Sequence, residues 1–237
     1  MHALIINGSP RTKKLSNTDK ILNKFTAGMM EAGSTFELYE VSDRKSWENM
    51  RQSFCRNENI LIAIPLFVEC IPGLLMEFLE TLEPELKAWR EAETKQVTGR
   101  ETSPDAKKKR LSFILQSGFA EGVQLRCGEA YLMRLAKTLG CEYGGTLVKG
   151  NNFGIRLVEG EEQEKITVPY QAMGRIYAET GNFDSEACRK FTGPEIFPAP
   201  VRVLVGLMFK TFAKRGFKQA AKSWGCTKPL DDRPYAQ

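Results

Sequence analysis

The side chains best suited to chemistry in this chain form a cluster near the amino terminus. They lie between an apolar run at residues 3–6 and a segment with helical apolar spacing that starts near Ile21. The cluster consists of Ser9, Arg11, Ser16, Asn17 and Thr18. Hydroxyls, an arginine and the free N–H groups of a helix start together bind phosphate well. An ordinary polar turn is the alternative, but the density of these side chains favours an anion site.

The spacing of this loop excludes two common phosphate motifs. The stretch NGSPRTKKLSNT has neither the GxGxxG spacing of a dinucleotide loop nor the GxxxxGK[ST] of a triphosphate loop. Ser16 is a candidate N-cap for the helix that follows. The amino terminus therefore predicts a strand, a phosphate-binding loop and a helix.

The elements that would position this loop follow from the apolar pattern. Apolar runs at residues 3–6, 35–41, 59–65, 111–116 and 144–148 predict five strands. Helical spacing predicts helices from about residue 17, over 43–56, from Pro72 through about Trp89, over 123–139 and over 170–180. This alternation predicts an α/β fold with a parallel sheet and helices on both of its faces.

Two further loops should lie at the same edge of that sheet, because ligands of parallel sheets bind at the carboxyl ends of the strands. One follows Pro65 and contains Leu66, Phe67 and Val68; the other contains Gln116, Ser117 and Gly118. A core position is the alternative for Phe67. Its place directly after a strand that ends in proline favours the site.

Composition places limits on the function. The 237 residues are 42% apolar and 27% charged, and no run approaches the roughly 18 apolar residues of a membrane span. Six cysteines without a CxxC pair argue against a zinc or iron–sulfur site and fit reduced thiols in a cytoplasmic protein with no signal peptide. The net charge of +5 fits an anionic small molecule and is too small for a nucleic-acid partner.

The last part of the chain differs from the rest. We expect a sheet domain over residues 1–190 and a tail over 191–237, made of a proline-rich linker and a basic amphipathic helix over about 201–223. We expect this helix to pack on its own domain or on a second subunit, with its basic residues facing water. Peripheral contact with anionic lipid is the less favoured alternative.

The three loops together resemble the NADPH-dependent FMN reductase family of flavodoxin-like flavoproteins. The matching motifs are GSPR with SNT at residues 8–18, IPLF with IPGLL at 64–75, and QSG at 116–118. Leu66 and Phe67 stand where that family usually has a tyrosine. The resemblance implies a flavodoxin-like three-layer sandwich with a sheet ordered 2-1-3-4-5, followed here by a C-terminal helical extension.

The resemblance also implies a cofactor and its contacts. Ser9, Arg11, Ser16, Asn17 and Thr18 would hold the phosphate of FMN. Pro65, Leu66, Phe67 and Val68 would flank the flavin ring, and Gln116, Ser117 and Gly118 would meet its other edge. A homodimer is the usual state of the family.

The expected function is that of an FMN-dependent NAD(P)H oxidoreductase. NADPH or NADH would reduce the bound flavin, which would pass electrons to a quinone, a flavin or another small acceptor. No catalytic side chain is needed, because the flavin is the reactive group. A flavodoxin-type electron carrier and a flavin-free binding module are the alternatives.

Overall fold

The computed structural model describes residues 1–67, 70–83 and 109–233. The predicted continuation of the third helix beyond residue 83 and the site residue Val68 lie outside these ranges. The chain divides into two compact units, Met1–Glu195 and Ile196–Gln237. Within the described residues, no helix is long and apolar enough to cross a membrane.

The first unit is built around a five-stranded parallel sheet in the order β2-β1-β3-β4-β5, which confirms the predicted order. The strands are β1 (His2–Asn7), β2 (Thr35–Glu40), β3 (Asn59–Pro65), β4 (Arg110–Gln116) and β5 (Glu142–Lys149). β3 is buried from Ile60 onward, as expected of a central strand, whereas β2 is an edge strand and only half-buried.

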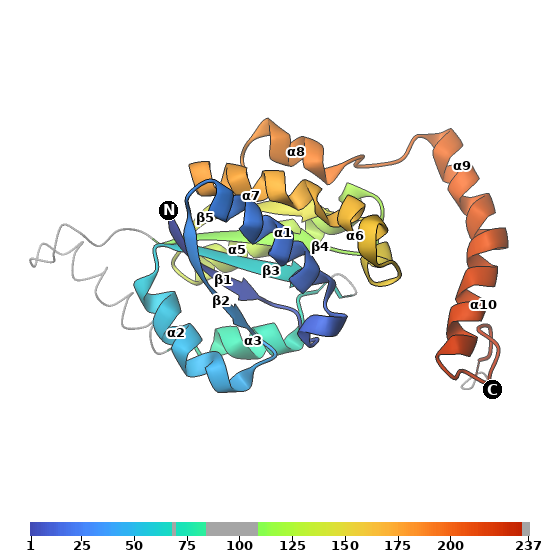
Figure 1. Cartoon of the computed structure of the whole chain (residues 1–237), viewed down its shortest axis with the longest axis horizontal. Coiled ribbons are helices and arrows are strands. Elements are labelled where there is room, and N and C mark those ends of the chain that lie inside the picture. The colour runs from blue at the N-terminus through green and yellow to red at the C-terminus, as the bar shows by residue number, and fades with distance from the viewer. Residues whose placement is uncertain (68–69, 84–108, 234–237) are drawn as a thin grey trace, which may run out of the picture. The chain divides into compact units, whose positions relative to one another are not determined.

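Helices cover both faces of this sheet and give it three layers (Figure 1). On one face pack α2 (Trp47–Arg56), α3 (Gly73–Glu80) and α5 (Arg126–Thr138). On the other pack α1 (Asn17–Glu31), α6 (Gly160–Thr167), α7 (Pro169–Thr180) and α8 (Glu186–Thr192). Successive side chains of a strand point to opposite faces of the sheet, so Leu4 and Ile6 pack in one core and Ala3 and Ile5 in the other.

The pair α1 and α7 is packed unusually closely. A Cβ atom on Gly28 would lie 1.9 Å from the backbone oxygen of Gln171, and one on Gly174 would lie 1.9 Å from that of Phe25. Both contacts are far inside van der Waals distance. Glycine at these two positions therefore lets the two helix backbones touch.

The second unit is a helical segment. It contains α9 (Ala199–Met208), a π-helical turn (Phe209–Ala213) and α10 (Lys214–Ser223), which corresponds to the helix expected over about residues 201–223. After α10 the chain turns back, and the amide of Cys226 donates to the carbonyl of Ala221 (2.9 Å). Ala221 is the one side chain in the described part of α9 and α10 that is buried.

Candidate functional site

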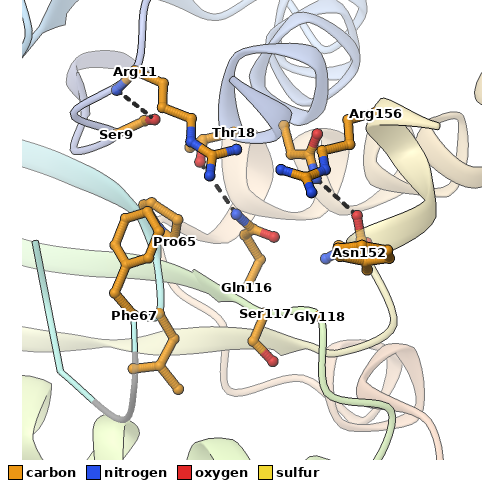
Figure 2. Close-up of a pocket in the computed structure, with 13 residues that line it drawn as sticks. Ser9, Arg11, Thr18, Pro65, Phe67, Gln116, Ser117, Gly118, Asn152 and Arg156 are labelled. Atoms are coloured by element: carbon orange, nitrogen blue, oxygen red, sulfur yellow. Dashed lines mark hydrogen bonds between the residues drawn. The ribbon is translucent and has the colours of Figure 1, made fainter. Parts of the chain in front are cut away.

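The loops that follow β1, β3, β4 and β5 border one cavity of about 260 Å³ at the carboxyl edge of the sheet. Figure 2 shows side chains from these loops converging on it. Ten of the twelve predicted site residues line the cavity: Ser9, Arg11, Asn17, Thr18, Pro65, Leu66, Phe67, Gln116, Ser117 and Gly118. The structure thus brings together three segments that lie far apart in the sequence.

The first loop is held in a tight curl by its own side chains. Asn7 Oδ1 accepts a hydrogen bond from the Ser9 amide (3.1 Å), and Ser9 Oγ accepts one from the Arg11 amide (3.3 Å). The amide of Gly8 donates to the carbonyl of Ala63 in β3 (2.8 Å), which fixes the loop against the neighbouring strand. This curl turns the Arg11 side chain into the cavity (Figure 2).

The helix that follows begins at the cavity. Ser16 is its N-cap, and its hydroxyl oxygen accepts a hydrogen bond from the Asp19 amide (3.1 Å). Ser16 is fully buried and does not line the cavity, so its oxygen serves the helix. Asn17 and Thr18 occupy the first turn, whose amides have no acceptor within a helix and carry its partial positive charge. The start of α1 therefore offers N–H donors to an anion.

The middle of the cavity is formed by the end of β4. Gln116 Nε2 donates to Thr18 Oγ1 across the sheet edge (3.3 Å). Ser117 Oγ accepts a hydrogen bond from the Phe119 amide (3.1 Å), and the Ser117 carbonyl accepts one from the Asn152 amide (2.9 Å). These bonds tie the first, third and fourth loops into one polar floor.

One wall of the cavity is apolar. The amide of Leu66 donates to the Gln116 carbonyl (2.8 Å), which holds the second loop beside β4. Phe67 and Cys70 exchange two backbone hydrogen bonds of 2.9 Å. Phe67 is 39% exposed, and the Arg11 guanidinium carbon lies 5.9 Å from the centre of its ring. A core position for Phe67 is therefore excluded.

The sequence analysis missed three residues that line the cavity, namely Asn152, Phe153 and Arg156. They follow β5, so the same rule that selected the other loops would have selected this one. Asn152 is held by Asn17, whose Nδ2 donates to its carbonyl (2.9 Å), and it donates through Nδ2 to the Tyr170 hydroxyl (2.8 Å). Burial raises the pKa of Tyr170, so its hydroxyl stays protonated.

Arg156 gives the cavity a second guanidinium group. Its central carbon lies 4.8 Å from the centre of the Phe153 ring, a cation–π geometry that orients the side chain. Figure 2 shows Arg11 and Arg156 entering the cavity from different sides. The described residues that line the cavity include no carboxylate. Two guanidinium groups at one cavity favour an anionic ligand.

Comparisons with solved structures identify the fold. An NAD(P)H:quinone oxidoreductase from Methanothermobacter marburgensis matches with a TM-score of 0.50 and 14% identity, over 77% of this chain and 99% of that one. The chain has the flavodoxin-like fold. An FMN-dependent NADH-azoreductase from Bacillus anthracis in complex with FMN matches with a TM-score of 0.50 and 14% identity, over 76% of this chain and 98% of that one.

A third match covers a larger share of the chain. An NADH:FMN oxidoreductase in its apo form has a TM-score of 0.50 and 14% identity, over 84% of this chain and 97% of that one. No protein-family profile and no curated protein matches the sequence. At these identities the likeness establishes the fold, and the function has to be argued from the cavity.

Proposed function

We propose that this protein is an FMN-dependent NAD(P)H oxidoreductase that passes electrons to a small acceptor. The observation that carries the proposal is the composition of one cavity, which has a cationic, N–H-rich end and an apolar wall. A phosphate monoester attached to a flat ring system needs both of these features. Solved proteins of the same fold are named as FMN-dependent and NAD(P)H-dependent reductases, which supports this choice.

The residues present fit FMN in character. Arg11, Thr18 and the first-turn amides of α1 would hold the phosphate, with Ser9 and Arg156 beside it. Asn17 Oδ1 is buried and has no hydrogen-bond donor among the described residues, while Nδ2 of the same side chain is fixed on Asn152. The orientation of this amide is therefore set, and its oxygen is directed to accept from a hydroxyl such as those of a ribityl chain.

The ring end is formed by the other two loops. Pro65, Leu66 and Phe67 would flank one side of the isoalloxazine, and Gln116, Ser117 and Gly118 would meet its polar edge. Gly118 lies against Phe153, since a Cβ atom on it would come within 3.2 Å of the Phe153 Cβ. Bound FMN would supply the hydride and electron chemistry, and these residues would position the ring and limit the access of water.

A visible spectrum tests the proposal directly. The purified protein, after addition of FMN and removal of excess, should be yellow and should bleach on anaerobic addition of NADPH or NADH. Reoxidation by a quinone or by free flavin would then identify the class of acceptor. A yellow protein that neither nucleotide bleaches would support an electron carrier instead. A colourless protein that takes up no FMN would refute the flavin assignment.

The quaternary state and the location also remain proposals. We propose a homodimer in the cytoplasm, as expected from the sequence. Light scattering on the FMN-loaded protein would measure the molar mass. A value equal to the 26.7 kDa of a single chain would refute the dimer.

A further inference from the structure

The net positive charge of the chain lies entirely in its second unit. Residues 196–237 carry eight lysines and arginines and two aspartates, whereas residues 1–195 carry 26 basic and 27 acidic side chains. Between Glu195 and Asp231 there is no acidic residue at all. A nearly neutral domain is thus followed by a segment with a net charge of +6. Such a segregated basic segment attracts an anionic partner.

The same segment displays large apolar side chains. In α9, Val203 is 65%, Leu204 58% and Leu207 57% exposed, and Arg202 is the one charged residue of this helix. Phe212 in the π-helical turn is 72% exposed, and Trp224 at the end of α10 is 64% exposed. Large apolar side chains exposed together in this way mark a surface that contacts an apolar partner. With ten residues, α9 is too short to span a bilayer, which takes about 20.

α10 separates its basic and apolar side chains. Lys214, Lys218 and Lys222 follow at four-residue spacing and form one stripe, whereas Phe217 and Trp224 are seven residues apart and form another. An open cleft of about 540 Å³ is lined mainly by apolar atoms, including those of Phe217, Trp224 and Leu230, and its charged lining residues are Lys210, Lys214 and Asp231. Apolar space next to ammonium groups suits an acyl chain beneath an anionic headgroup.

We propose that residues 199–230 bind the surface of an anionic lipid bilayer, with α10 in the plane of the headgroups and the apolar side chains of α9 and Trp224 buried among the acyl chains. This reverses the preference drawn from the sequence, in which the helix packs on its own domain or on a second subunit with its basic residues facing water. The reason is the combination of charge segregation with the exposure of the large apolar side chains of α9. It does not depend on the flavin assignment.

Two other occupants fit the observations less well. A second copy of the same segment would bring two sets of cations together without any acidic residue between positions 196 and 230 to offset them. A nucleic acid would neutralise the charge but would leave the exposed leucine, valine and phenylalanine side chains in water. An anionic bilayer satisfies both properties at once.

Vesicle co-sedimentation of the full-length protein tests the proposal. We expect binding to vesicles of phosphatidylglycerol and phosphatidylcholine in equal parts, much weaker binding to phosphatidylcholine alone, and loss of binding at high salt. The triple variant Lys214→Gln, Lys218→Gln, Lys222→Gln should bind on the order of 100-fold more weakly, since each cation near the surface contributes about fivefold. A matched control replaces the exposed Lys45, Lys137 and Lys165 of the first unit, and it should bind like the wild type.

A second variant separates insertion from charge attraction alone. Leu204→Ser with Phe212→Ser leaves every cation in place, and we expect it to bind at least tenfold more weakly to the mixed vesicles. The fluorescence of Trp224 should shift to the blue on binding, and Trp224→Phe should lack this shift. Absence of vesicle binding at low salt would overturn the proposal. So would equal binding to both lipid compositions, or self-association in solution that the Leu204→Ser, Phe212→Ser variant abolishes.

Discussion

Arg156 offers the sharpest test of how the cavity recognises its ligand. We expect Arg156→Gln to weaken FMN binding while leaving riboflavin, which lacks the phosphate, nearly unaffected. Phe153 orients the guanidinium in the absence of a ligand, so ligand binding costs little side-chain entropy.

The size of the effect follows from the number of groups that share the anion. A hydrogen bond to a charged group contributes about 1.5–3 kcal/mol, which corresponds to a factor of roughly 10 to 150 in Kd. Arg11 and the amides at the start of α1 would still hold the phosphate after the change. We therefore expect an effect in the lower half of this range, about 10- to 30-fold for FMN and less than about twofold for riboflavin.

Titration of the apo protein with each flavin, followed by quenching of flavin fluorescence, measures both constants. Arg175→Gln is the matched control, because Arg175 lies on α7, is half-exposed and pairs with Glu31 (2.9 Å) away from the cavity. If Arg156→Gln binds FMN as tightly as the wild type, Arg156 does not contact the phosphate. If both flavins weaken by the same factor, the residue acts on the ring or the ribityl chain, and the assignment of the two ends of the cavity is wrong.

Three further predictions concern stability and acidity. Gly28→Ala should lower Tm by about 5–10 °C, because overpacking costs about 1–3 kcal/mol or more. The control Gly73→Ala should leave Tm unchanged, because a Cβ atom at Gly73 meets nothing within 4 Å. If the two variants melt at the same temperature, the close contact at Gly28 is contradicted. Ser16→Ala should lower the free energy of unfolding by about 1 kcal/mol, measured by denaturant titration, because the N-cap is lost. A large loss of FMN affinity in the folded variant would instead mean that Ser16 contacts the ligand. Hydrogen bonds, the largest from Ser53, lower the pKa of Glu37 to about 2. The stabilisation from Glu37 is therefore complete above about pH 4.5 and lost as the pH falls towards 2, and Glu37→Gln should flatten this part of the acid-unfolding curve.

The sheet could be predicted from the sequence because its central strands are continuous apolar runs. β3 was predicted over the residues that form it, and β4 begins only one residue earlier than expected. β5 is longer than the predicted 144–148, since Glu142 and Tyr143 lack apolar continuity but still pair with β4. Gly145, with a φ of 87°, interrupts the pattern where the register shifts.

The helices that escaped prediction lack an apolar stripe. α6 has the sequence GEEQEKIT and buries only Thr167, so its position is determined by contacts with its neighbours, which the sequence does not display. α8 is seven residues long and buries two side chains. Residues 191–195, which the sequence analysis assigned to the tail, lie in the first unit, where the Phe191 ring packs edge-on against Tyr170.

Part of the candidate site was predictable once the order of the strands was known. The loops after β1, β3 and β4 carry residue types whose chemistry is visible in the sequence, and the fold brings them together. The contribution of Arg156 was not visible, because a single arginine four residues after an asparagine pair has no recognisable spacing. The role of Ser16 depended on geometry, since a serine before a helix can either cap it or face a ligand, and here its oxygen caps α1.

The glycine contacts between α1 and α7 also determine where the first-turn amides of α1, and an anion bound to them, lie along the helix axis. If α1 slid along α7 by one residue, a side chain would replace Gly28 or Gly174 at a point where only a hydrogen atom fits. The axial position of α1 is therefore fixed to within one residue, and with it the level of its first-turn amides. We infer that the phosphate end of the cavity holds its ligand at a fixed position. The Leu66–Phe67 end belongs to a loop, so substitutions there can change ligand specificity without disturbing the fold.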